Sequence, residues 1–201
     1  MEFDPDLEIR PASGSRVTTF TRGEDLFHAG EAGLAWRIRS GVVRLDRLGE
    51  TGREFGGLAL AGDVLGAETL LLGQYSFSAR ALTDVFIEPW ASSPEAATPH
   101  MLLQALSSSK ERQADSLALR SGTPEHRISQ LLAVMGRGLA HGQRIARVVL
   151  PQLRDIAEMT GLTVETVSRT ISRLNRSGSL ELGGTLRAKQ VSIDLQSSLL
   201  T

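Results

Sequence analysis

The sequence predicts an α+β protein: a β-rich N-terminal half, one long helix, and a C-terminal half of helices and strands. Twelve glycines fall between Gly14 and Gly73 and separate short apolar runs. No glycine occurs between Gln74 and Ser121, and apolar residues recur at helical spacing after Pro124. We therefore expect a domain at 1–98, a helix at 99–121 and a domain at 122–201.

The charges are divided unequally between these parts. The 201 residues carry 22 Lys+Arg and 23 Asp+Glu, a net charge of −1. Residues 1–121 hold 12 Lys+Arg against 17 Asp+Glu, whereas residues 122–201 hold 10 against 6. A basic C-terminal half of net charge +4 indicates a polyanionic partner for that half.

Composition excludes several classes of function. The chain has no cysteine, which excludes disulfides, thiol catalysis and cysteine-ligated zinc or iron–sulfur clusters. No apolar run reaches the roughly 18 residues of a membrane span, and the acidic start does not resemble a secretory signal. An enzyme on a cupin-like barrel would need clustered histidines and carboxylates, and only His28 lies in the N-terminal half ahead of the long helix. We expect a cytoplasmic, non-enzymatic protein with no metal site and no membrane partner.

The N-terminal half predicts a β-sandwich or barrel. Its short apolar runs alternate with glycine turns, and the stretch from Phe77 to Trp90 is expected to form its last strands. The residues before Gly14 are interpreted as a loose arm.

The long helix is expected over His100–Ser121, about 33 Å by helical rise. One face presents a candidate dimer seam of Leu103, Leu106, Lys110, Gln113, Leu117 and Arg120. This seam is only half apolar, so a helix that lies along its own barrel is the alternative.

A second helix is expected to begin with Thr123 as N-cap and Pro124 in its first position. Its apolar residues are Ile128, Leu131, Leu132, Met135 and Leu139. The glycines at 136, 138 and 142 are expected to end it.

Two short helices joined by a glycine turn follow. Leu153, Ile156, Ala157 and Met159 make the first apolar face, and Gly161 lies in the turn. Thr163 is the N-cap of a second helix at 163–177 that Gly178 ends; its expected buried stripe is Val164, Val167, Ile171 and Leu174. This pattern predicts a helix-turn-helix.

The outer face of the second helix is suited to DNA. Glu165, Ser168 and Arg169 lie together near its start, where recognition helices meet base edges. Arg pairs with guanine and Glu with cytosine N4. Thr163, Thr166, Arg173 and Arg176 are expected to contact phosphates. The alternative is that Glu165 and Arg169 form an ordinary i,i+4 pair.

A β-hairpin is expected after Gly178, from Leu180–Leu182 and Val191–Ile193 around Gly183 and Gly184. As the wing of a winged helix-turn-helix, it would bring Arg187 and Lys189 close to the DNA backbone. The alternative is a hairpin that only covers the small core.

The segment Gly161–Arg169 resembles the recognition segment of the CRP/FNR family of bacterial transcription regulators, and of its FNR/FixK branch in particular. Glu165, Ser168 and Arg169 match that branch's Glu-x-x-Ser-Arg positions. Further likenesses are Ala61–Gly66, Ile38–Gly41, His28–Glu31 and Arg127-Ile128.

The resemblance implies a cyclic-nucleotide-binding-like β-barrel of the double-stranded β-helix or jelly-roll type, and a dimerisation helix. It also implies a homodimer that binds a T-T-G-A-type palindrome and an activator that recruits RNA polymerase, with a repressor of the same fold as the alternative.

The sequence departs from the family in its effector site. The Arg-Ser pair that holds a cyclic nucleotide's phosphate falls at Phe77-Ser78, and the acidic position falls at Ala67 with Glu68 one residue late. We expect no cyclic AMP binding, because Phe77 offers neither a cation nor a donor. The weakly indicated effector pocket consists of Gly62, Glu68, Phe77, Ser78 and Arg80, and Arg80 keeps a cyclic-nucleotide-gated sensor open as an alternative.

Two further departures concern cofactors and DNA. The branch's cluster sensor needs cysteines, which this chain lacks, so no cofactor is predicted. A heme held by His28 or His100 is the open alternative. Gln152-Leu153 replaces the usual Thr-Arg, and Gln152 can still contact a phosphate.

Overall fold

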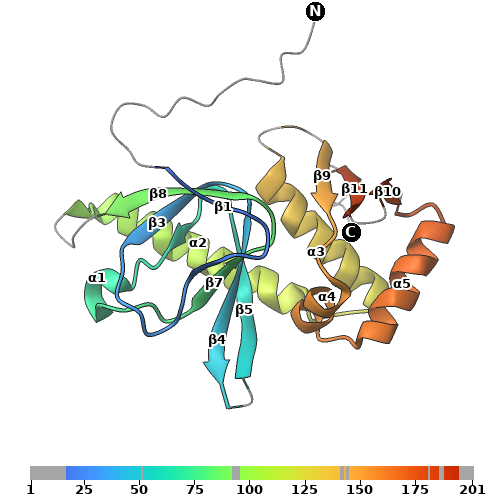
Figure 1. Cartoon of the computed structure of the whole chain (residues 1–201), viewed down its shortest axis with the longest axis horizontal. Coiled ribbons are helices and arrows are strands. Elements are labelled where there is room, and N and C mark those ends of the chain that lie inside the picture. Colours follow the sequence, from blue (N-terminus) through green and yellow to red (C-terminus); the bar gives the residue numbers. More distant parts are fainter. Residues whose placement is uncertain are drawn as a thin grey trace, which may run out of the picture.

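The computed structural model describes residues 17–50, 52–91, 96–140, 143, 145–180, 182–185 and 188–194. The predicted N-terminal arm lies outside these residues. Figure 1 shows the strands of the N-terminal half on one side of the molecule and the helices α3, α4 and α5 on the other, with α2 running along the barrel toward α3.

Two antiparallel sheets of four strands form the N-terminal domain. The first contains, in spatial order, β1 (Thr18–Phe20), β8 (Val85–Ala91), β3 (Ala35–Ser40) and β6 (Val64–Leu65). The second contains β2 (Asp25–Phe27), β7 (Ser78–Ala81), β4 (Val42–Gly49) and β5 (Gly52–Leu60). Buried residues from both sheets pack together, among them Ile38, Ile87, Val43 and Ala79. The predicted jelly-roll barrel is confirmed.

The β4–β5 hairpin contains a bulge that affects the domain interior. Leu45 pairs with Gly57 and Asp46 pairs with Phe55, so Gly56 is the extra residue. A Cβ atom on Gly56 would come within 2.7 Å of the Phe77 ring. The absence of a side chain here therefore lets Phe77 lie against the hairpin.

Two helices accompany the barrel. The short α1 (Thr69–Leu72) follows β6. The long α2 (Pro99–Ala118) begins one residue before the predicted helix, because Thr98 caps it by accepting a hydrogen bond from the Met101 N–H. It ends three residues early, because the N–H groups of Arg120 and Ser121 bond carbonyls only three residues back and Gly122 then adopts φ +84°.

The helix α3 (Pro124–Leu139) has Thr123 as its N-cap, as predicted. The prediction that Gly136 and Gly138 help to end it is wrong, because both lie buried within the helix. A Cβ atom on Gly138 would come within 2.9 Å of the Leu60 side chain of β5. Gly138 therefore allows α3 to lie close against the barrel. Its role is in this packing and not in ending the helix.

The C-terminal domain combines helices with a small sheet. After α3 come β9 (Ile145–Val149), α4 (Leu153–Thr160), α5 (Val164–Arg176), β10 (Leu182–Thr185) and β11 (Ala188–Asp194). The predicted hairpin is confirmed as β10 and β11, but β11 also pairs with β9, which makes a sheet of three strands. Leu180 precedes the hairpin and is buried in the core instead.

One apolar core joins the two domains. It includes Val42, Phe55 and Leu58 from the barrel together with Ile128 and Ile156 from the C-terminal helices. The C-terminal domain is therefore packed directly onto the barrel. Within the described residues, no helix is both long enough and apolar enough to cross a bilayer.

Candidate nucleic-acid interface and effector pocket

The helix-turn-helix has the geometry that its sequence predicts. Gly161 adopts φ +65° at the end of α4, where its N–H bonds the Ala157 carbonyl. The Thr163 side chain then caps α5 by accepting a hydrogen bond from the Thr166 N–H at 3.2 Å. The cap at the end of α4 and the cap at the start of α5 together set the angle between the two helices.

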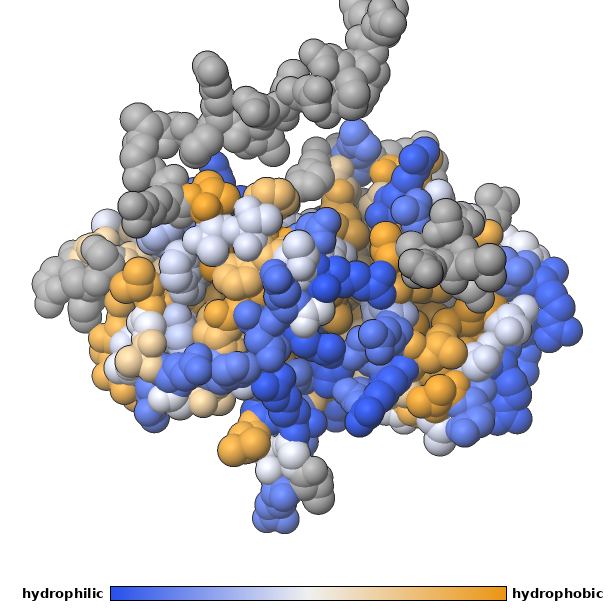
Figure 2. All heavy atoms as spheres, viewed as in Figure 1, coloured by the Kyte–Doolittle hydropathy of each residue, from blue (hydrophilic) through white to orange (hydrophobic). Residues whose placement is uncertain are grey.

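The three predicted base-reading residues all lie exposed on α5. These are Glu165, Ser168 and Arg169. The Arg169 Nε donates to the Glu165 backbone carbonyl at 3.4 Å, not to its carboxylate. Since this contact joins Arg169 to backbone, it leaves the Glu165 carboxylate available to accept from a base. Figure 2 shows a hydrophilic surface along α5.

The buried stripe of α5 differs from the prediction at one position. Val167 and Ile171 are buried and Leu174 is half-buried, as expected, but Val164 is 43% exposed. Thr170 is buried in its place. The inward face of α5 therefore starts at its fourth residue, Val167.

The predicted phosphate-contacting residues fall into four groups. Gln152 and Arg176 are exposed, and Gln152 occupies the N-cap position of α4 without a capping hydrogen bond from its side chain. Thr163 and Thr166 bond each other through their hydroxyls at 3.0 Å. Arg173 forms an ion pair with Glu125 of α3. Arg187 lies outside the described residues, as does the side chain of Lys189.

A residue outside the predicted set holds the turn in place. Arg127 of α3 donates from Nη1 to the Thr160 carbonyl at the end of α4, and from Nε to the Gly122 carbonyl. Because Gly122 lies between α2 and α3, this single side chain connects the linker to the helix-turn-helix. The sequence places Arg127 in the helix that follows Thr123, but it gives no sign of the two carbonyls that Arg127 contacts.

The long helix α2 carries an unusual amount of exposed apolar surface. None of its 20 residues is buried. Met101 and Ala105 pack against barrel residues, which confirms part of the alternative in which the helix lies along its own barrel. Away from the barrel, Leu103 and Leu117 are 65% and 73% exposed, and Lys110 is exposed as well. The other three predicted seam residues are exposed but lie on the barrel side. Leu106, 57% exposed, and Gln113 border a pocket against the barrel, and Arg120, beyond the end of α2, lies over the Phe55 ring. The helix therefore has one face on the barrel and one free leucine face.

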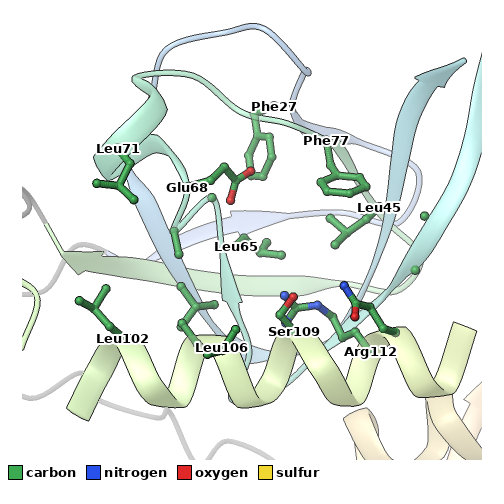
Figure 3. A pocket seen from close by; sticks show the side chains of 17 residues that line it. Phe27, Leu45, Leu65, Glu68, Leu71, Phe77, Leu102, Leu106, Ser109 and Arg112 are labelled. Atoms are coloured by element: carbon green, nitrogen blue, oxygen red, sulfur yellow. The ribbon is translucent and has the colours of Figure 1, made fainter. Parts of the chain in front are cut away.

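A pocket of about 360 Å³ lies between the barrel and α2 (Figure 3). Its wall is largely apolar, with Phe27, Leu45, Leu65 and Phe77 from the barrel side facing Leu102 and Leu106 of α2. Its polar residues include Glu68, Ser109 and Arg112. The volume and mixed lining fall within the range of small-molecule sites.

Only part of the predicted effector set reaches this pocket. Glu68 and Phe77 line it, but Gly62 borders a different hollow beside Arg37. The Ser78 hydroxyl accepts a hydrogen bond from the Ala29 N–H, and Arg80 is paired with Asp155 of α4. Arg80 is thus directed toward the C-terminal domain, a placement that sequence alternation within one strand could not show.

Arg112, which lines the pocket, has an acidic neighbour. Its Nη1 lies 3.5 Å from the Asp63 carboxylate and is buried with no hydrogen-bond partner in the described structure. Burial raises the pKa of Asp63, against the lowering effects of the Leu60 N–H and of Arg112. A phosphate that approached Arg112 would therefore also meet the Asp63 carboxylate.

The histidines considered for heme are on the surface. His28 is half-buried beside Arg53 and Asp25, with 45% of its side chain exposed, and His100 is exposed at the start of α2. In the described part of the chain, no group of three or more His, Asp or Glu residues is placed to hold a metal ion.

Comparisons with known proteins agree with this architecture. Residues 17–87 match the cyclic nucleotide-binding domain family, and residues 126–193 match the Crp-like helix-turn-helix domain family. The nitrogen fixation regulation proteins FixK of Azorhizobium caulinodans and Bradyrhizobium diazoefficiens are 32% and 33% identical. Each alignment covers 84% of this chain, and 72% and 75% of those proteins.

A similar solved structure is that of a CRP-family transcriptional regulator from Thermus thermophilus. It is 25% identical and has a TM-score of 0.70, and the match covers 90% of this chain and 94% of that one. The domain order and the placement of the helix-turn-helix are therefore shared with known regulators.

Proposed function

Because the chain belongs to the CRP/FNR family of DNA-binding transcription regulators, and not to a family of enzymes, we propose that it acts as a homodimer on a palindrome of T-T-G-A-type half-sites. The observation that carries this proposal is the exposure of Glu165, Ser168 and Arg169 on the first half of α5, above a capped and packed turn. In this motif those helix positions enter the major groove.

The chemistry of the three side chains suits this half-site. A T-T-G-A sequence has one guanine, and the opposite strand has a cytosine at the same pair. Arg169 can donate to guanine O6 and N7, Glu165 can accept from cytosine N4, and Ser168 can contact either a base or a sugar. Gln152, Thr163, Thr166 and Arg176 are available for phosphates on either side.

The proposed dimer is supported by α2. In the part of the chain that the structure describes, no residue covers the leucines on the free face of this helix. Such a face is energetically costly in water, and a second copy of α2 would bury it. Two parallel copies would place two recognition helices on successive half-sites of one DNA face. The same family relation supports activation through RNA polymerase in the cytoplasm, with a repressor of the same fold as the second candidate.

The proposed input differs from cyclic AMP. Phe77 stands in the pocket where a phosphate would need a donor, and Arg112 faces Asp63. We expect calorimetry with cyclic AMP to show no heat of binding, and a micromolar isotherm would instead support the cyclic-nucleotide-gated alternative. An absorption spectrum of the purified protein without a Soret band is expected, since His28 and His100 lie at the surface.

The decisive experiment is selection of bound sequences from random DNA duplexes with the protein as purified. We expect enrichment of two inverted T-T-G-A-type half-sites at a fixed spacing. Binding should weaken steeply with added salt, since phosphate contacts release counterions. Enrichment of an isolated half-site would contradict the dimer, and no enrichment at all would contradict base reading.

A further inference from the structure

We propose that Arg44 and Arg80 of the barrel are positioning residues for DNA binding and act through Asp155 and Glu158 of α4. They form an ionic joint, defined here as Arg44, Asp46, Arg80, Asp155 and Glu158. The inference rests on the proposed function, because it concerns how a dimer places two recognition helices on one palindrome.

Arg44 is the centre of the ionic joint. Its Nε donates to Asp46 at 2.7 Å, its Nη1 to Asp155 at 3.1 Å and its Nη2 to Glu158 at 2.7 Å. All three nitrogens of the guanidinium therefore have carboxylate partners, one in the barrel and two on α4. The planar group fixes these three carboxylates relative to one another.

Arg80 provides a second connection from the neighbouring strand. Its Nη2 lies 2.5 Å from Asp155 Oδ1, the same oxygen that accepts from Arg44. Glu158 also accepts from Arg154 of its own helix at 3.1 Å. With Arg154 included, three arginines face three carboxylates, so the charges at the junction balance.

The ionic joint is mostly withdrawn from water. The side chain of Arg44 is 2% exposed and that of Asp46 is 3% exposed, whereas Glu158 lies at the edge. Burial acts to raise the pKa of Glu158, but hydrogen bonds from Arg44 and Arg154 outweigh it and lower the pKa. Removing one partner of such a buried group leaves the others without compensation, so the arrangement resists displacement.

The position of α4 determines where α5 lies. α4 leads through Gly161 directly into the cap of α5, and Arg127 bonds the last carbonyl of α4. A carboxylate anchored on α4 by the barrel therefore fixes the recognition helix relative to α2, which packs on the same barrel. A second barrel contact, from Arg22 Nη2 to the Leu150 carbonyl at 2.8 Å, holds the chain just before α4.

The ionic joint is also accessible from the surface. Figure 2 shows hydrophilic side chains where the β4–β5 hairpin approaches α4. A hollow of about 440 Å³ at this place is bordered by the ionic joint and by Gln152, a proposed phosphate contact. The barrel thus influences both the angle of α5 and the surroundings of Gln152.

A dimer must present its two recognition helices about 34 Å apart to reach both half-sites at once. Without the ionic joint, the shared apolar core would still hold the domains together, but the angle of each helix-turn-helix would be less sharply fixed, because apolar packing is not directional. Binding to one half-site needs no fixed spacing and should be unaffected. The ionic joint should therefore matter for a palindrome and not for a single half-site.

The test uses the full-length protein and the partly exposed members of the joint, Arg80→Gln and Glu158→Gln, so that Arg44 keeps Asp46. The matched control is Arg47→Gln, which breaks an exposed ion pair with Glu54 farther along the same hairpin. Each variant is checked for its melting temperature and its dimeric state. Affinities are then measured for a palindromic duplex and for a duplex with one half-site scrambled.

We expect Arg80→Gln and Glu158→Gln to lose about tenfold in affinity for the palindrome, with unchanged affinity for the single half-site and with Arg47→Gln equal to wild type. Equal losses on both duplexes, no loss on either, or a gain on the palindrome would overturn the inference. A wild-type protein that does not prefer the palindrome would overturn the proposed function as well, so the two failures are distinguishable.

Discussion

At the scale of single residues, Arg169 combines exposure with a defined chemical role. Among the described residues its side chain hydrogen-bonds the Glu165 backbone carbonyl and forms no ion pair, so its guanidinium can turn toward a base without breaking one. Arg173 on the same helix differs, because Glu125 of α3 holds it. The two arginines should therefore contribute differently to DNA binding.

Arg169→Ala should weaken binding to the DNA site found by selection by about 1–3 kcal/mol of binding free energy, and it should relax specificity at the guanine position. Electrophoretic or fluorescence titrations with the cognate duplex and with a duplex altered at that base pair would measure this. Arg176→Ala is the control, since loss of a phosphate contact should weaken binding to both duplexes equally. An Arg169 variant that weakens both duplexes equally would show that Arg169 does not read a base.

Gly161→Ala tests the turn at the same scale. Gly161 has φ +65°, and a Cβ atom there would meet only the Arg127 side chain, at 3.9 Å. The substitution should therefore cost only the backbone strain of the left-handed region, about 1–2 kcal/mol of unfolding free energy. Denaturant unfolding monitored by circular dichroism would check it, and an unchanged midpoint would mean that the turn relaxes.

At the scale of elements, α2 has two different faces. One packs on the barrel through Met101 and Ala105, and the Ser116 hydroxyl lies 3.4 Å from the Gly56 carbonyl. The other presents leucines to water. The packing on the barrel agrees with one of the two interpretations that the sequence allowed. The dimer seam stays a prediction, and the exposed leucines leave room for it.

The double variant Leu103→Glu, Leu117→Glu should convert the dimer to a monomer, because each leucine is replaced by a charge in the proposed seam. Neither residue lines the pocket. Analytical ultracentrifugation would measure the mass, with Gln104→Glu as an exposed control on another face of α2. A variant that keeps the dimer mass would place the dimer contact elsewhere.

At the scale of the whole molecule, the two domains share an apolar core and an ionic joint. The Glu158 pKa is lowered in the folded protein, so the stabilisation by this carboxylate is present above its ordinary pKa of 4.5. It is lost as the pH falls through the lowered value, because protonation then favours the unfolded chain. The sign is opposite for Asp63, whose raised pKa favours the folded state on acidification.

The difference in unfolding free energy between wild type and Glu158→Gln should therefore be present at neutral pH and shrink as the pH falls below about 4.5. Parallel thermal or denaturant unfolding of the two proteins across this range would measure it. Taking the difference removes the contribution of Asp63, which both proteins share. A difference that stays constant down to strongly acidic pH would mean that Glu158 does not stabilise the fold as an anion.

Much of the fold and of the DNA-reading face could be predicted from the sequence. The caps Thr123 and Thr163, the turn at Gly161 and the apolar spacing of α5 are local signals, since each depends on residues within one or two helical turns. Exposure of Glu165, Ser168 and Arg169 follows from the same spacing. These features needed no long-range contact, and the structure agrees with them.

Local sequence patterns could not predict the contacts of a residue whose partner lies far away in the chain. Gly138 lies inside α3 because Leu60 packs against it, and Arg80 points to Asp155 75 residues away, not into an effector pocket. Arg44 meets Asp155 across 111 residues. Short-range periodicity was enough to predict the succession of strands and helices and the exposed face of α5, because both depend on residues close together in the chain. How the barrel holds α4 became visible only in three dimensions, because that contact joins residues far apart in the chain.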